Sequence, residues 1–120
     1  HFFSENERVK RAAADLEANH FMEFLAVIKE SGNSSFKYLQ NVYSSHNSEC
    51  QPIPMALAFS EYYLKDNGVC RVHGGGFAGT IQAFVKDEAV AGYKEFIEKI
   101  FGEGTCHVLK IRKQGGMKVQ

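Results

Sequence analysis

The architecture of this chain depends on one segment, Val69-Cys70-Arg71-Val72-His73-Gly74-Gly75-Gly76-Phe77-Ala78-Gly79-Thr80-Ile81-Gln82-Ala83-Phe84-Val85. Its two ends, residues 69–73 and 80–85, are rich in β-branched and aromatic side chains and predict two strands. Residues 74–79, here called the glycine loop, contain four of the eleven glycines of the chain. Because glycine adopts positive φ without a steric penalty, the glycine loop predicts a tight connection between the two strands.

Helical periodicity fills most of the remaining sequence. Apolar residues at helical spacing predict helices over 4–18, 20–30, 34–43, 54–65 and 87–101. A capping box of Ser4 and Glu7 is expected to start the first helix, and Asn19 to cap the second. Residues 31–33 are expected to end the second helix, and Gly68 to act as the C′ residue of the fourth. The polar residues 44–53 predict a surface loop.

A third strand is predicted over residues 106–111, after Gly102 and Gly104. Helices come first and strands later, which indicates an α+β fold rather than an alternating α/β fold. A strand, a helix and a strand across residues 80–111 imply a right-handed crossover. No internal repeat or linker divides the sequence, so residues 1–120 are expected to form a single domain.

The composition excludes several classes of protein. The chain is 44% hydrophobic and 23% charged, which is typical of a globular domain rather than a disordered chain. Fourteen basic and fourteen acidic residues balance, so no general field favours nucleic acid or a membrane as partner. Three widely spaced cysteines indicate reduced thiols and a cytoplasmic location. The chain does not begin with Met, so we expect a domain of a longer protein.

The glycine loop has more than one interpretation on its residues alone. Consecutive amides in such a turn can form a nest that binds an anion. The loop also matches G-x-G-x-x-G, but a dinucleotide site requires a helix next, whereas residues 80–85 predict a strand. A tight turn without any ligand remains the simplest alternative.

Three segments resemble a known family. Residues 71–80, Arg71-Val72-His73-Gly74-Gly75-Gly76-Phe77-Ala78-Gly79-Thr80, resemble the galactokinase motif R-M-T-G-[AG]-G-F-G-G-C. Residues 1–9 are similar to the H-x-x-x-E-N-x-R-V segment that opens the carboxy-terminal half of galactokinases. Residues 30–41 resemble the E-S-G-x-S-S…L-x-N segment of the same half. The segments occur in the family's order and extend over essentially the whole chain.

The resemblance implies a GHMP-kinase carboxy-terminal fold, with helices packed on a small, mostly antiparallel, ferredoxin-like sheet. It implies ATP-dependent phosphorylation of galactose or a related sugar at the 1-hydroxyl, with ATP and Mg²⁺ as cofactors. The phosphate loop and the catalytic aspartate of the family lie in its amino-terminal domain, so this chain would not be catalytic alone. Its expected partners are that kinase domain and a sugar. The residues expected to support the phosphate and substrate cleft are Arg71, His73, Gly74, Gly75, Gly76, Phe77 and Gly79.

The match to the motif is incomplete. His73, Ala78 and Thr80 replace the family's Thr, Gly and Cys, so galactose itself is a less secure expectation than the family. Arg71 either faces the cleft, where a guanidinium suits phosphate, or pairs with a carboxylate. The alternative functions are a non-catalytic sensor of sugar and nucleotide and a free-standing binding domain.

Cysteine and histidine chemistry is not expected to contribute. Cys70 and His73 point to opposite faces of a strand, as do Cys106 and His107. At most one ligand of each pair would face a common metal ion, which is short of the usual four for structural zinc.

Overall fold

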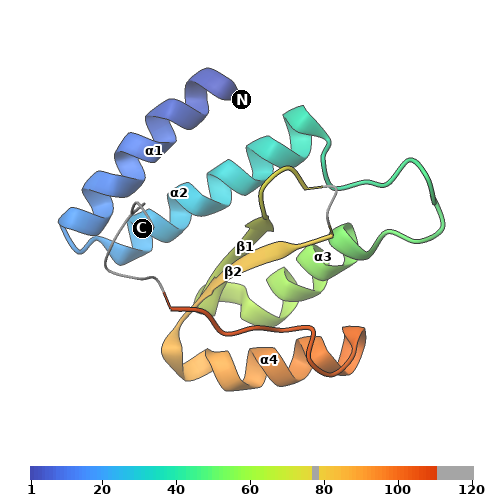
Figure 1. The fold of residues 1–120 in the computed structure, drawn as a ribbon. Coiled ribbons are helices and arrows are strands. Elements are labelled where there is room, and N and C mark those ends of the chain that lie inside the picture. The colour runs from blue at the N-terminus through green and yellow to red at the C-terminus, as the bar shows by residue number, and fades with distance from the viewer. Residues whose placement is uncertain (77–78, 111–120) are drawn as a thin grey trace, which may run out of the picture.

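The computed structural model of the chain describes residues 1–76 and 79–110 (Figure 1). The helices are α1 (Phe2–Glu17), α2 (Phe21–Ser34), the π-helical η1 (Ser35–Leu39), α3 (Pro52–Leu64), the 3₁₀ turn η2 (Lys65–Asn67) and α4 (Asp87–Phe101). The strands are β1 (Gly68–Val72) and β2 (Ile81–Val85). The fold is therefore mixed α+β, as the sequence predicts.

The two strands form an antiparallel sheet, and the glycine loop connects one strand to the other. Their register runs from Gly68 opposite Val85 to Val72 opposite Ile81, which confirms the predicted pair of strands. Gly68 begins β1 with an extended backbone, so its predicted role as a left-handed C′ residue is wrong. A Cβ at Gly68 would lie 2.5 Å from the carbonyl oxygen of Phe84. Glycine is needed here for strand pairing rather than for ending α3.

The sheet lies between two helical layers (Figure 1). On one face, α2 contacts β1, and Phe24 of α2 packs edge-to-face against Phe84 of β2 with ring centroids 5.6 Å apart. On the other face, α3 contacts both strands and α4 packs against α3. Leu64, Tyr93 and Ile97 form the buried cluster on that side. The helix α1 forms the outermost layer, against α2.

The start of α1 and the end of α2 differ from the predictions. The capping box is wrong, because α1 starts at Phe2 and the Ser4 hydroxyl instead donates a hydrogen bond to the carbonyl of His1. Asn19 has φ of 56°, and His20 takes the N-cap position of α2. Helix α2 continues through Gly32, where a Cβ would lie 2.8 Å from the Cβ of Arg71. Gly32 therefore allows α2 to pack closely on β1 and does not end it.

Other elements are shorter or absent. The predicted third helix is reduced to η1, which continues from α2 and ends at Gln40, a residue with left-handed backbone. Residues 106–110 form no strand, so the prediction of a third strand and crossover is wrong over that range. Residue 111 of that prediction lies outside the described residues. The loop predicted over 44–53 is confirmed up to Gln51, and α3 starts at Pro52 rather than Pro54.

Candidate functional site

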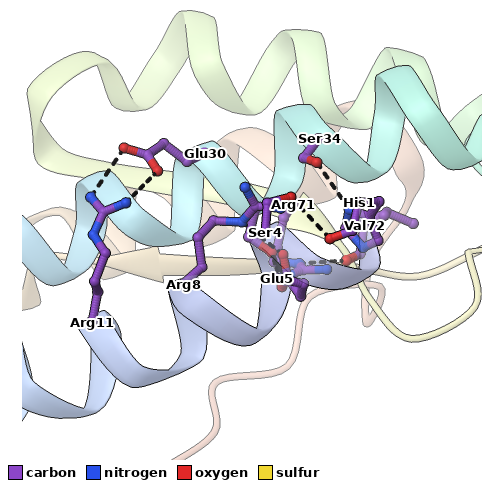
Figure 2. Close-up of polar contacts among 10 residues, drawn as sticks. His1, Ser4, Glu5, Arg8, Arg11, Glu30, Ser34, Arg71 and Val72 are labelled. Atoms are coloured by element: carbon purple, nitrogen blue, oxygen red, sulfur yellow. Dashed lines mark hydrogen bonds and ion pairs between the residues drawn. The ribbon is translucent and has the colours of Figure 1, made fainter.

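The residues that carry the sequence resemblance meet at two places in the structure. The first is a polar cluster formed by Glu5 of α1, Ser31 of α2 and Arg71 of β1, here called the Glu5–Ser31–Arg71 cluster. Figure 2 shows Glu5 and Arg71 of this cluster side by side. The Arg71 guanidinium donates to the Ser31 hydroxyl, which donates in turn to the Glu5 carboxylate. Arg71 also lies 3.6 Å from Glu5 as an ion pair.

Two guanidinium groups, those of Arg71 and Arg8, surround the single carboxylate of Glu5. Arg8 Nε donates to the other carboxylate oxygen of Glu5 at 2.8 Å. Burial by itself would raise the pKa of Glu5, but hydrogen bonds from Ser31 and Arg8 and the charges of Arg8 and Arg71 lower that pKa below its ordinary value. The carboxylate is thus held ionised, and it joins the three elements in one network.

Arg71 makes the ion pair with a carboxylate that was one of the alternatives predicted for it. Its guanidinium pairs with a carboxylate on the α2 face of the sheet, and its Nε donates to the carbonyl of Val72 at 3.1 Å. Val72 is the last residue of β1, directly before His73 and the glycine loop. Arg71 therefore connects α1 and α2 to the start of the loop.

Two further contacts tie α1 to α2 (Figure 2). The imidazole Nδ1 of His1 lies 3.0 Å from the Ser34 hydroxyl, and Arg11 binds both carboxylate oxygens of Glu30 at 3.0 and 3.3 Å. Helix α1 is consequently held by polar contacts, and none of its residues is fully buried.

The glycine loop is a compact turn stabilised by its own backbone. His73 N–H donates to the Thr80 carbonyl, Gly76 N–H to the His73 carbonyl and Gly79 N–H to the Gly76 carbonyl, at 3.1, 3.3 and 3.1 Å. Gly74, Gly76 and Gly79 have φ of 60°, 93° and 80°, which favours glycine at these positions. The predicted site residue Phe77 lies outside the described residues, as does Ala78.

The amides of Gly74 and Gly75 differ from those of the other loop glycines. Neither N–H donates to an acceptor in residues 1–76 or 79–110, and a Cβ at either position would meet nothing within 4 Å. These adjacent donors are exposed to solvent and could bind an anion. The His73 side chain beside them is exposed and makes no hydrogen bond with the described part of the chain.

Gly76 forms the second meeting place of the resembling segments. It is buried, and a Cβ there would lie 2.1 Å from the carbonyl oxygen of Asn41. Asn41 is itself only 4% exposed, and its side-chain oxygen accepts a hydrogen bond from Ser35 at 3.1 Å. The loop is thus anchored to the end of η1 by close backbone contact, and Gly76 has a packing role.

A pocket of about 430 Å³ lies beside this anchor. It is lined by residues 41–47 and 50–53, together with Gly79. Of the predicted site residues that the structure describes, Gly79 lines it. The sequence predicts residues 44–53 only as a surface loop and does not predict this pocket. The available signal was a run of uncharged polar side chains, but its closeness to the glycine loop depends on the tertiary fold.

The three cysteines differ in their exposure to solvent and in their surroundings. Cys70 is buried, its thiol donates to the Leu57 carbonyl at 3.7 Å, and burial raises its pKa to about 12. Burial also raises the pKa of Cys106, while Cys50 is exposed. Over residues 1–76 and 79–110, no group of three or more His, Cys, Asp and Glu side chains is arranged to hold a metal ion.

Comparison of the chain with protein-family models, with curated proteins and with solved structures found no match. Among the described helices, none combines the length and the apolar character needed to cross a membrane.

Proposed function

We propose that this chain is the carboxy-terminal domain of a galactokinase-like sugar kinase in the cytoplasm. The parent enzyme would transfer phosphate from ATP to the 1-hydroxyl of galactose or a related sugar. The chain would have the ferredoxin-like carboxy-terminal fold of the GHMP kinases, beside an amino-terminal kinase domain. One observation carries the proposal: three segments chosen for their resemblance, and distant in sequence, contact one another through their motif residues, Glu5 with Ser31 and Arg71, and Asn41 with Gly76.

The glycine loop would support the phosphate end of the cleft. Gly74 and Gly75 carry the two adjacent amides that donate to no described acceptor, so they are the groups best suited to a phosphate oxygen. Phosphoryl transfer depends mainly on positioning and on stabilising charge. The described residues have no group arranged for a metal ion, so Mg²⁺ would be held largely by the other domain.

The test compares the full parent protein with this chain alone. The expected result is ATP-dependent phosphorylation of galactose or another hexose by the parent and none by the chain. Gly75→Ala in the parent should lower kcat/KM, because the added methyl group obstructs an open amide without touching the core. Catalysis by the chain alone would contradict the proposal. Binding of sugar and nucleotide without turnover by the parent would favour a non-catalytic sensor instead.

A further inference from the structure

We propose that the pocket between residues 41–53 and Gly79 binds the uncharged ring of a sugar rather than its phosphate. The inference rests on the proposed function for the choice of a sugar as ligand, and it adds a location on this chain. The pocket volume of about 430 Å³ is within the range of small-molecule sites.

The chemistry of the lining favours a neutral ligand. None of the lining residues is Asp, Glu, Lys or Arg, although they include several hydroxyl, amide and imidazole groups. The hydroxyls of Ser44 and Ser45 and the ring of His46 make no hydrogen bond with residues 1–76 or 79–110. These groups can exchange hydrogen bonds with sugar hydroxyls, whereas a phosphate would lose hydration without gaining an opposite charge.

Two of the lining residues, Gln51 and Tyr43, make contacts that stabilise the shape of the pocket without a ligand. The Gln51 side chain accepts from the Ser44 amide at 2.9 Å and donates to the carbonyls of Ser44 and Asn47 at 2.9 and 3.0 Å. The Tyr43 ring packs edge-to-face on Phe36 with centroids 5.5 Å apart, yet it is 49% exposed. A fixed and exposed aromatic face suits the C–H face of a sugar ring, and a formed pocket lowers the entropic cost of binding.

Asn41 also lines the pocket. Its side-chain oxygen is used by Ser35, whereas its amide nitrogen has no partner in the described part of the chain. The N–H groups of that nitrogen are therefore candidate donors to a sugar hydroxyl.

The test is a titration of the ¹⁵N-labelled 120-residue chain followed by NMR. D-galactose is the neutral probe, and galactose 1-phosphate is its charged counterpart with the same ring. The expected result is saturable shifts of the amides of residues 43–47 with galactose, and binding at least about fivefold weaker for the phosphate. Ser45→Ala should weaken galactose binding about fivefold through loss of one hydrogen bond, while Ser48→Ala, in the same loop but outside the lining, should leave it unchanged.

Two outcomes would overturn the inference: galactose that leaves these amides unmoved, or a sugar phosphate that binds at least as tightly as the free sugar. Kinase activity of the parent without this binding would overturn only the pocket assignment. Galactose binding at the pocket by a parent that has no kinase activity would support the pocket and contradict the proposed catalysis.

Discussion

Replacing Gly76 by alanine should destabilise the chain far more than the same change at its neighbour Gly75. The new Cβ at Gly76 would lie 2.1 Å from the Asn41 carbonyl oxygen, which is backbone and cannot rotate aside. Forcing such a shift costs about 1–3 kcal/mol. The φ of 93° adds about 1–2 kcal/mol for a residue with a side chain. The reduced freedom of the unfolded chain returns about 0.4–1 kcal/mol. The net loss is therefore about 1–5 kcal/mol.

Gly75 is the matched control for this experiment. A Cβ there meets nothing within 4 Å, and Gly75 is not among the glycines with positive φ. Gly75→Ala should therefore change the free energy of unfolding by less than about 1 kcal/mol. The measurement is urea unfolding, followed by circular dichroism, of the two variants and of the unsubstituted 120-residue chain. With a slope of about 2 kcal/mol/M, in the middle of the range for small proteins, Gly76→Ala should lower the midpoint by about 0.5–2.5 M.

Equal midpoints for the two variants would refute the reasoning, since they would show that the Asn41 contact does not restrict Gly76. The comparison also governs how activity data are interpreted. In the proposed parent enzyme, a Gly76 variant that loses turnover would report mainly a damaged loop anchor. Loss of turnover in a Gly75 variant of unchanged stability would instead support the proposed contact between the loop and the substrate.

Three other predictions concern single side chains. Because the pKa of Glu5 is lowered in the folded state, its stabilising contribution is present above about pH 4.5 and is lost as the pH falls through the folded pKa. Glu5→Gln should therefore flatten the stability profile below about pH 5, and a parallel profile in both proteins would contradict this. At pH 8 a thiol reagent should label Cys50 rapidly and leave Cys70, with its pKa of about 12, unlabelled until the chain unfolds; equal rates would be inconsistent with its burial. Tyr93→Phe removes a 2.7 Å hydrogen bond to Ser60, which is 0% exposed, and should cost about 1–3 kcal/mol in thermal unfolding; an unchanged midpoint would show that the Ser60 hydroxyl finds another partner.

The segments with a strong local pattern are the ones that the sequence predicted well. Residues 81–85 alternate in a β-branched and aromatic run and form β2, while Asp87 starts α4 as predicted. In both cases the local preference agrees with the burial that the tertiary structure imposes. The glycine loop belongs to this group as well, because positive φ at Gly74 and Gly79 is a local requirement.

The errors occur where tertiary contact replaced a local preference. Gly32 resembles a helix stop, but α2 passes through it because β1 approaches too closely for a side chain. Helix α1 shows its apolar side outward, with Phe3 84% and Val9 62% exposed, while Glu5 and Arg8 face α2 and β1. Hydrophobic periodicity correctly predicts a helix over most of residues 2–17. It does not predict the polar cluster, with which the polar side of this helix faces inward and its apolar side faces solvent.

In the candidate site, too, the local sequence pattern predicts some features, and tertiary contacts decide the others. Glycines that are identical in the sequence differ in the structure: Gly76 is closed by Asn41, whereas Gly74 and Gly75 are open with unpaired amides in the described part of the chain. Arg71, expected near phosphate, is occupied by Glu5. Under the proposed function, the charge that Arg71 could offer a phosphate is partly offset by Glu5, while the open amides and the uncharged pocket remain. This arrangement would then suit a domain that positions a sugar and one phosphate edge while another domain supplies the charge for transfer.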